Sequence, residues 1–358
     1  MRNKVLNVFS IIILFVVIIG QLAVAANFTG YNEDEVTKVY DKKGEYIFSI
    51  AMGVTTGDRY ISQDNKEYKV VKVNNNKAIA EYEGDIELKA ELTVNVNNLP
   101  FMAVENKKTV GIYHTHNDES YKPGSVSIKG KGDIHDVGRQ LAKSLKEKGI
   151  ETIYSDNLHL PHDGAAYSRS RATALSIAKN RPDIILDLHR DAIPDVSEYT
   201  TNINGKNVTQ VRLVVGRQNP NRKVNDQFAR RLKAISDKVT PGLIKDIFYG
   251  KGEYNQSIFP NSVLMEFGTY GNRQRQAIDA ANLLASPISY LLYGGKGNKP
   301  LGSDVEQRAA FRTVLWIIGI FIAGLFAYLY FIEGSLEGVK KRIKRFFGRE
   351  LTDKGDNK

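Results

Sequence analysis

The sequence contains no cysteine among its 358 residues. Disulfide bonds, thiolate metal ligands and a cysteine nucleophile are therefore excluded. A protein-bound metal ion would have to be held by histidine, aspartate or glutamate. Collagen-like periodicity, internal repeats and the composition of a disordered chain are also missing, because 42% of the residues are hydrophobic and 25% are charged. This composition and length predict one sizeable folded core with a small companion domain.

Acidic residues are outnumbered by basic ones, which gives a formal net charge of +10. Such a charge favours attraction to an acidic polymer, which could be an anionic cell wall, a nucleic acid or lipid headgroups. Part of the excess is local, because residues 340–349 are strongly basic. No nucleic-acid recognition motif accompanies the charge, so we expect no nucleic-acid partner.

The N-terminus has the pattern of a secretory signal peptide over residues 1–25. Arg2 and Lys4 precede an apolar run over residues 5–20, and Ala23-Val24-Ala25 has the small-x-small pattern that signal peptidase reads. The alternative is an uncleaved N-terminal membrane anchor, since the apolar run is long enough to span if it is retained. Either interpretation predicts that the following residues lie outside the cytoplasm.

A second apolar run lies near the C-terminus. Residues 314–332 carry no charge, and a helix of this length can cross a bilayer core of about 30 Å. We expect a transmembrane helix over 311–333, preceded by a glycine-rich linker over 294–310. The basic tail, 334–358, should then stay in the cytoplasm. The predicted localisation is the cell membrane, with a single pass and an extracytoplasmic catalytic domain.

Residues 27–293, which lie between the two hydrophobic segments, show two different sequence patterns. Residues 27–104 contain short alternating runs separated by turn residues, which predict a small β-rich module. Residues 105–293 alternate apolar strands with amphipathic helices, which predicts an α/β domain around a mainly parallel sheet flanked by helices. The expected strands cover 109–113, 150–154, 183–188, 212–215 and 262–266, and the expected helices cover 136–148, 168–180, 225–238 and 273–292.

Imidazoles and carboxylates follow three of these strands at their carboxyl ends, where ligands bind in such sheets. His116, Glu119 and His189 could supply two nitrogens and one oxygen to a catalytic zinc ion, with one position left for water. A further carboxylate must take a proton from that water and give it to a leaving amine. Glu266 follows an apolar strand and is the best candidate for this acid and base.

The other histidines are weaker candidates for metal ligands. His114 alternates with His116, so the two share a face of an extended strand, and His114 is expected to contact a ligand or the substrate. His135 precedes a helix and is interpreted either as a residue near the site or as a neighbour of the helix cap. His159 and His162 flank Leu160-Pro161 and are expected to be surface residues of a loop.

Arg190 and Asp191 follow directly after His189. Asp191 could orient an imidazole, and Arg190 could bind a substrate carboxylate or stabilise an oxyanion as a catalytic residue. The alternative for both is a solvated ion pair.

Several of these motifs together resemble the stage II sporulation protein P family, and they occur in family order from about residue 105 to 293. The matching segments are 112–121 (Ile-Tyr-His-Thr-His-Asn-Asp-Glu-Ser-Tyr), 137–138, Leu141, 187–192, 216–221, Asn225, 254–256 and 264–268. A second hydrophobic segment near the C-terminus departs from the family pattern.

The resemblance implies a zinc-dependent N-acetylmuramoyl-L-alanine amidase, which splits the amide between the lactyl group of N-acetylmuramic acid and the L-alanine of the peptidoglycan stem peptide. It implies that His116, Glu119 and His189 hold the zinc ion and that Glu266 is the catalytic carboxylate. Expected partners are the stem peptide and glycan, the membrane through the C-terminal helix, and a partner wall hydrolase or membrane complex.

Two other functions are compatible with the same residues. One is another zinc hydrolase of the cell wall, such as a carboxypeptidase or a carbohydrate deacetylase. The other is a non-catalytic wall-binding membrane protein that keeps the fold. The second alternative would be expected to lack a ligand or the base, yet all four residues are present.

Overall fold

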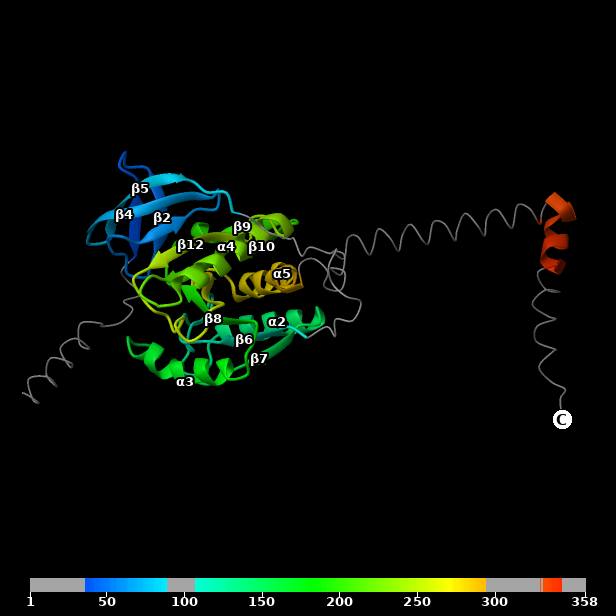
Figure 1. Cartoon of the computed structure of the whole chain (residues 1–358). Helices are drawn as coiled ribbons and strands as arrows, with labels where there is room; N and C mark the ends of the chain where they lie inside the picture. Colours follow the sequence, from blue (N-terminus) through cyan, green and yellow to red (C-terminus); the bar gives the residue numbers. More distant parts are fainter. Residues whose placement is uncertain (1–35, 89–106, 294–328, 330, 343–358) are drawn as a thin grey trace, which may run out of the picture. The chain divides into compact units, whose positions relative to one another are not determined.

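A computed structural model describes residues 36–88, 107–293, 329 and 331–342 of the chain (Figure 1). The chain divides into two units, residues 1–298 and residues 299–358. In the second unit, the described residues 329, 331–333 and 336–342 are helical. All other elements belong to the first unit.

Several predictions fall on residues outside this description. The signal peptide over 1–25, the linker over 294–310 and nearly all of the transmembrane helix over 311–333 are among them. Within the parts of the chain that the structure does describe, no helix is both long enough and apolar enough to cross a bilayer. These three assignments therefore stay predictions.

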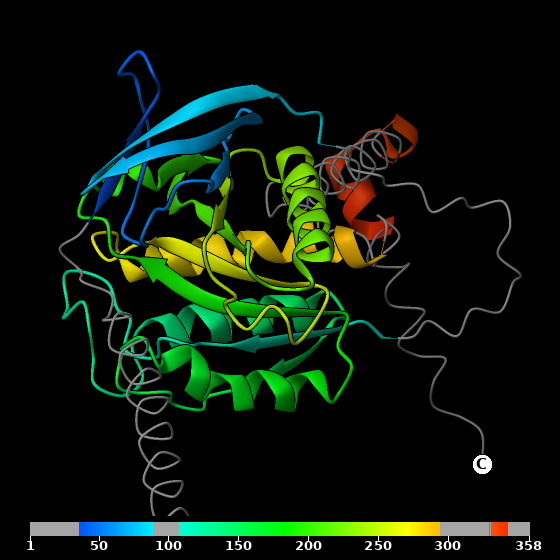
Figure 2. The same cartoon turned by 60° about the vertical axis from the view of Figure 1, so that its left-hand side comes forward.

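An eleven-stranded sheet forms the centre of the first unit, in the strand order β2-β1-β5-β4-β3-β12-β11-β13-β8-β6-β7. Figures 1 and 2 show the N-terminal strands at one end of this sheet and β6 towards the other. The strands are β1 (Thr37–Tyr40), β2 (Tyr46–Ile50), β3 (Arg59–Ile61), β4 (Lys66–Asn74), β5 (Lys77–Asp85), β6 (Thr109–Tyr113), β7 (Glu151–Tyr154), β8 (Ile184–Asp191), β11 (Val211–Gly216), β12 (Ile244–Gly250) and β13 (Ser262–Thr269). A separate antiparallel ribbon pairs β9 (Thr200–Ile203) with β10 (Lys206–Thr209).

The prediction of a mainly parallel sheet is wrong for the sheet as a whole. Five of its ten strand pairings are antiparallel, and the separate ribbon adds a sixth antiparallel pairing. Within residues 105–293, for which it was made, the prediction holds for the pairings of β7 with β6, β6 with β8, β8 with β13 and β11 with β12. The antiparallel pairings arise because β11 runs against β13 and because the N-terminal hairpins join the same sheet. Short hairpin connections force antiparallel neighbours, whereas parallel neighbours need a longer crossover.

Residues of the predicted β-rich module extend the sheet of the α/β part. β3 pairs antiparallel with β12, with Ile61 opposite Ile247 and Tyr60 opposite Phe248. The predicted boundary at residue 104 falls outside the described residues. The β-rich character of the N-terminal stretch nevertheless agrees with its five strands.

Helices cover both faces of the α/β part. One face packs against α2 (Ile134–Glu147), α4 (Arg222–Val239) and α5 (Gln274–Tyr293). The other face packs against α3 (Ala166–Ala178), where Ile177 meets Tyr113 and Ile185. The spacing of apolar residues in the sequence accounts for the helices. In α2, for example, Val137, Leu141 and Leu145 recur at the helical spacing and are buried, and a turn with Gly149 at a φ of 77° follows the helix.

Because neighbouring residues of a strand point to opposite faces, the two faces of β8 differ. Leu186 and Leu188 belong to the core under α2 and α5, whereas Ile185 packs with the α3 face. His189 is therefore on the same side as α3. This is the face on which the functional site lies.

Candidate metal centre

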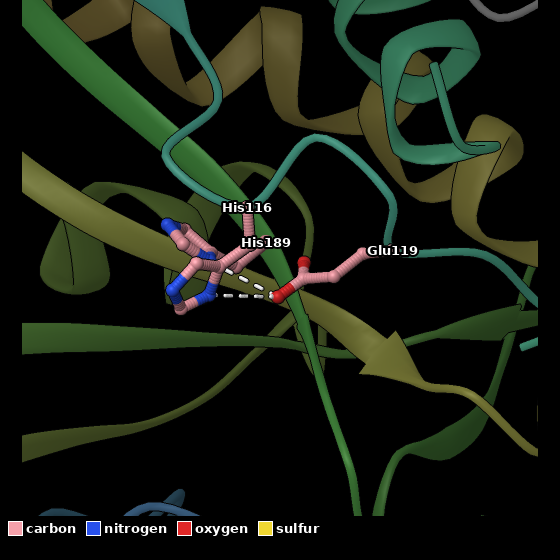
Figure 3. A group of neighbouring side chains, drawn as sticks. All are labelled: His116, Glu119 and His189. Carbon is pink, nitrogen blue, oxygen red and sulfur yellow. Dashed lines mark hydrogen bonds and ion pairs between the residues drawn. The ribbon is translucent and has the colours of Figure 1, made fainter. Parts of the chain in front are cut away.

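Three buried side chains converge at the carboxyl ends of β6 and β8. His116 and Glu119 come from the loop after β6, and His189 comes from β8. Figure 3 shows both imidazole rings facing one carboxylate oxygen: His116 Nδ1 lies 3.2 Å and His189 Nδ1 lies 3.3 Å from Glu119 Oε1. One candidate ligand atom from each residue lies within 4.8 Å of the others. The structure thus brings together the three residues that the sequence predicted as ligands.

The spacing of Glu119 Oε1 from each of the two imidazoles suits a tetrahedral metal ion. With metal–ligand distances of about 2.0–2.1 Å, two ligand atoms of a tetrahedral site lie about 3.3–3.4 Å apart. The measured separations of 3.2 and 3.3 Å match that edge length. Two imidazoles and one carboxylate are also a donor set that zinc takes in catalytic sites with an open fourth position.

His189 is held in place by a second carboxylate. Its Nε2 lies 3.0 Å from Asp187 Oδ1. Asp187 in turn accepts hydrogen bonds from the backbone N–H of Thr115 at 2.8 Å and from the Thr115 hydroxyl at 2.6 Å. The Asp187 carboxylate beside Nε2 favours a proton on that nitrogen, which leaves Nδ1, the atom that faces Glu119, for a metal. Asp191 was predicted to orient an imidazole. In the structure Asp187 is the carboxylate beside the His189 ring, whereas Asp191 makes other contacts.

Protonation of the cluster follows from its burial and its carboxylates. Burial lowers the pKa of His189, but the carboxylates of Asp187 and Glu119 outweigh burial and raise that pKa well above its usual range. Burial lowers the pKa of His116 to about 4. Burial raises the pKa of Glu119, but the two histidines outweigh it and hold that pKa well below its usual range. A divalent ion bound here would take the place of the His189 proton, because ligating histidine must be neutral.

The loop that carries His116 and Glu119 is shaped by close backbone packing. A Cβ atom on Gly132 would lie 2.3 Å from the carbonyl oxygen of Glu119, so only glycine fits at this position. The other oxygen of Glu119, Oε2, accepts a hydrogen bond of 2.7 Å from the backbone N–H of Arg190. These contacts fix the carboxylate between the loop and β8.

Glu266 lies in β13, directly opposite His189 in the parallel pairing with β8. Cross-strand partners project from the same face, so Glu266 stands beside the ligand cluster. Its Oε2 is buried and has no hydrogen-bond partner among the described residues. Burial raises the pKa of the Glu266 carboxyl well above its usual range, and the charges of Asp191 and Glu119 add to this effect. The raised pKa favours the protonated carboxyl, which is the form that a proton donor needs.

His114 is not part of the ligand cluster. Its Nδ1 lies 3.1 Å from the carbonyl oxygen of Leu188, and its Nε2 lies 3.1 Å from the hydroxyl of Tyr154. Burial lowers the pKa of His114 to about 3, so the ring is neutral. The side chain is fully buried. The structure therefore does not show the predicted contact of His114 with a ligand or the substrate. The ring instead contacts β8 on the α2 side of the sheet, opposite the ligand cluster.

A family model of Stage II sporulation protein P (SpoIIP) matches residues 33–289. The chain belongs to this family. The matched segment includes every strand that the structure describes and most of α5. The Stage II sporulation protein P of Bacillus subtilis (strain 168) is 29% identical over 230 residues, which are 58% of this chain and 57% of that relative. The chain thus spans less than two thirds of the relative's length.

Solved amidase structures from three organisms are similar to parts of this SpoIIP-family chain. The CwlD amidase of Clostridioides difficile, solved in complex with the GerS lipoprotein, has a TM-score of 0.36 at 14% identity and covers 52% of this chain and 98% of its own. The amidase AmiC2 of Nostoc punctiforme has a TM-score of 0.35 at 14% identity, with 52% and 96% covered. Ami1 of Mycobacterium smegmatis has a TM-score of 0.36 at 14% identity, with 52% and 95% covered. Assignment to the SpoIIP family rests on sequence, since these identities and TM-scores are low.

Arg190 points away from the ligand cluster of this SpoIIP-family site. It is the neighbour of His189 in β8, so its side chain leaves the opposite face of the sheet. Its guanidinium donates to the carbonyl oxygens of Ser120 at 3.2 Å and Val126 at 2.7 Å, and it lies over the ring of Tyr270. The predicted catalytic role of Arg190 is not supported by these contacts, which instead hold the loop after Glu119.

Two residues near the cluster were missed by sequence reasoning. The ring of His162 stacks on His116 with the centroids 3.8 Å apart, and His162 Nδ1 lies 2.8 Å from Asp118 Oδ1. The ring of Tyr167 stacks with His189 at 6.3 Å and meets His116 edge-on at 5.5 Å. His162 was predicted to lie on the surface, and only the chain's return from β7 towards α3 brings it to the site. No local pattern signals such a contact.

His159 and His135 are also buried, contrary to the surface prediction for His159. His159 Nδ1 lies 2.7 Å from the carbonyl oxygen of His114 and its Nε2 lies 2.8 Å from the Thr173 hydroxyl. His135 lies with its ring centroid 4.5 Å from that of His114, and its Nδ1 is 3.2 Å from Asp156 Oδ1. Of the two interpretations of His135, the structure favours the residue near the site, behind the ligand loop.

Proposed function

We propose that this protein is a zinc-dependent peptidoglycan hydrolase, an N-acetylmuramoyl-L-alanine amidase that cleaves the amide between the lactyl group and L-alanine. The observation that carries the proposal is the buried cluster of His116, Glu119 and His189 with Glu266 beside it, whose Oε2 has no hydrogen-bond partner among the described residues. Membership of the SpoIIP family supports a substrate in the cell wall.

The residues have separate tasks in this mechanism. His116, Glu119 and His189 would hold the zinc ion, which when bound would lower the pKa of a water ligand towards about 7 and polarise the scissile carbonyl. Asp187 keeps His189 in the tautomer that presents Nδ1. Glu266 accepts the proton of the attacking water and delivers it to the amine of L-alanine as the C–N bond breaks, which leaves a free carboxylate on the lactyl group.

Burial of the cluster serves this chemistry. Surroundings that exclude water strengthen the attraction between the ligands and a cation, and they keep the pKa of Glu266 high. A carboxyl with a raised pKa keeps the proton that it must give to the leaving amine. A solvated glutamate, with a pKa of about 4.3, would be a poor acid for this step.

The test is digestion of purified peptidoglycan by the full-length protein with zinc, followed by mass spectrometry of the products. The proposal expects about one zinc ion per chain, stem peptides with a new L-alanine amino terminus and glycan with an intact lactyl carboxylate. Loss of an acetyl group would indicate a deacetylase instead, and shortened stem peptides would indicate a peptidase. Binding to the wall without any cleavage in the presence of zinc would indicate a non-catalytic protein.

We also propose that the catalytic part lies outside the cytoplasm and is tethered by the uncharged segment over 314–332. The lack of charge in this segment and the basic residues that follow it support this orientation. The measurement is protease accessibility of tags in intact cells. A tag at residue 358 should be protected and the region of residues 107–293 should be accessible, whereas release of the protein by alkaline carbonate would contradict the tether.

A further inference from the structure

A row of four charged or ionisable side chains crosses the sheet at the level of the metal centre. Adjacent strands pair His189 in β8 with Glu266 in β13, Glu266 with Arg212 in β11, and Arg212 with Asp246 in β12. Directly paired residues project from the same face of a sheet, so the row runs from a metal ligand to a buried ion pair. Glu266 occupies the position between them.

Arg212 is fully buried and its donors are committed to protein groups. Its Nε and Nη2 donate to the two oxygens of Asp246 at 2.8 and 3.0 Å, which is the bidentate geometry of the strongest arginine pairs. Its Nη1 donates to Asp191 Oδ2 and to the carbonyl oxygen of Ser49, both at 3.1 Å. Arg212 therefore joins three strands of the sheet to the end of β8.

Asp191 extends this connection to the N-terminal strands. Its Oδ1 accepts a hydrogen bond of 3.1 Å from the backbone N–H of Ala51, just after β2. Its Oδ2 also accepts a hydrogen bond of 2.9 Å from the hydroxyl of Tyr199. Asp191 lies two residues after His189 in the same strand. The chain of contacts thus runs from β2 through Arg212 and Asp191 to the strand that carries a predicted ligand.

Such a buried set is a weak source of stability, because the cost of removing the charges from water offsets much of their attraction. Hydrophobic residues of similar volume often stabilise a fold as well or better. Its geometric effect is more specific. A bidentate pair fixes the planes of Arg212 and Asp246, and the third donor fixes Asp191 relative to both.

We propose that Arg212 is a positioning residue of the site, which through Asp191 and the β2 backbone sets the spacing of β8 and β13 and so holds Glu266 against the metal centre. This inference rests on the proposed function. It makes the N-terminal strands part of the catalytic architecture, although none of the predicted ligands comes from them. Loss of the set should reduce the rate of the chemical step and leave substrate binding and metal binding in place.

The experiment compares the full-length wild type with the double variant Arg212→Met/Asp246→Leu, which removes both partners and leaves neither of these two charges unpaired. Arg212→Lys tests rescue by a conservative change that keeps the charge but loses the bidentate geometry. The matched control is Lys233→Met/Asp237→Leu, which removes an ion pair of 2.9 Å between a buried lysine and an aspartate one turn away in α4, outside the row. Zinc content, thermal unfolding, and kcat and KM on a soluble glycan-peptide fragment are measured for each.

The double variant should bind one zinc ion per chain, with kcat lower by about tenfold or more and KM changed by less than about twofold. Arg212→Lys should recover part of kcat, and the control should keep kcat while its melting temperature changes. A folded, zinc-loaded double variant with a kcat within about twofold of wild type would overturn the inference, and so would an effect on KM alone.

If the double variant does not fold, Tyr199→Phe carries the test, because it removes one hydrogen bond to Asp191 and only one oxygen atom from the protein. It should lower kcat by about threefold or more at unchanged zinc content, and an unchanged kcat would overturn the inference. Wild-type protein without amidase activity would overturn the proposed function and this inference together, whereas an active wild type with equally active variants would overturn only the inference.

Discussion

Asp187 and His189 are alternate residues of β8, and Asp187 Oδ1 lies 3.0 Å from His189 Nε2. Both are buried, so the carboxylate lies beside the imidazole ring without competition from water. Asp187→Asn should keep the fold and weaken zinc binding by about 10- to 100-fold, as loss of such supporting groups does in other metal sites. Zinc competition with a chelator measures this. Asp183→Asn, near the start of the same strand, is the control, and equal affinities for the two variants would contradict the role of Asp187.

The choice between His114 and His116 as ligand can be decided by metal analysis. His116→Ala should lose the stoichiometric zinc ion, since one of three protein ligands is removed. His114→Gln should keep one zinc ion per chain, because its ring contacts Leu188 and Tyr154 instead of the cluster. Zinc retained by the first variant and lost by the second would reverse the assignment.

Glu266→Gln should abolish most of the activity while zinc stays bound. Glutamine has the same shape but cannot take up or release a proton, so kcat should fall by about 10²- to 10⁴-fold. Stability should change little, because burial already favours the uncharged form of this carboxyl. Glu83→Gln, an exposed position in β5, is the matched control. Near-normal turnover by Glu266→Gln would exclude the mechanism proposed above.

Arg190→Lys separates the structural interpretation of Arg190 from the predicted catalytic one. The lysine ammonium cannot reproduce the planar pair of N–H donors with which Arg190 contacts the carbonyl oxygens of Ser120 and Val126. The free energy of unfolding should therefore fall by about 1.5–3 kcal/mol. Turnover per zinc-loaded, folded molecule should stay within about threefold of wild type. Denaturant unfolding and steady-state kinetics measure the two effects. A large loss of turnover at unchanged stability would restore the catalytic role.

The burial of His114 predicts a loss of stability in mild acid. Its pKa is about 3 in the folded protein and 6.5 for the unperturbed side chain, so between these values the unfolded state binds the additional proton. The free energy of unfolding should therefore fall as the pH falls from 6.5, by about 1.4 kcal/mol per pH unit for this histidine. Burial shifts the pKa of His135 and His159 in the same direction.

Denaturant unfolding with a chelator present, between pH 6.5 and 4.5, measures this slope without the contribution of metal binding. His114→Gln should be less stable at pH 6.5 and should show a shallower dependence on pH than wild type. Parallel curves for the two proteins would mean that His114 takes up its proton equally in the folded and unfolded states.

Sequence alone predicted the strands and helices around the site and the three residues that converge. Strand periodicity identifies β6, β8 and β13, and polar residues at their carboxyl ends identify the site, because the carboxyl ends of parallel strands meet at one edge. Alternation within β8 could also have identified Asp187 as a partner of His189 and shown that Arg190 points the other way.

Tertiary structure decided what lies behind and beside the ligands. Whether His114 or His116 faces Glu119, and whether His162 is on the surface or stacked on His116, depends on how loops fold back across the sheet. Joining of β3 to β12 brings Ser49 and Ala51 to Arg212 and Asp191, which are more than a hundred residues away in the chain. A strand's own pattern records which of its faces is buried, but it carries no information about which distant strand will form the next hydrogen bonds. For that reason the three residues that converge could be predicted from the sequence, and most of the groups that support them could not.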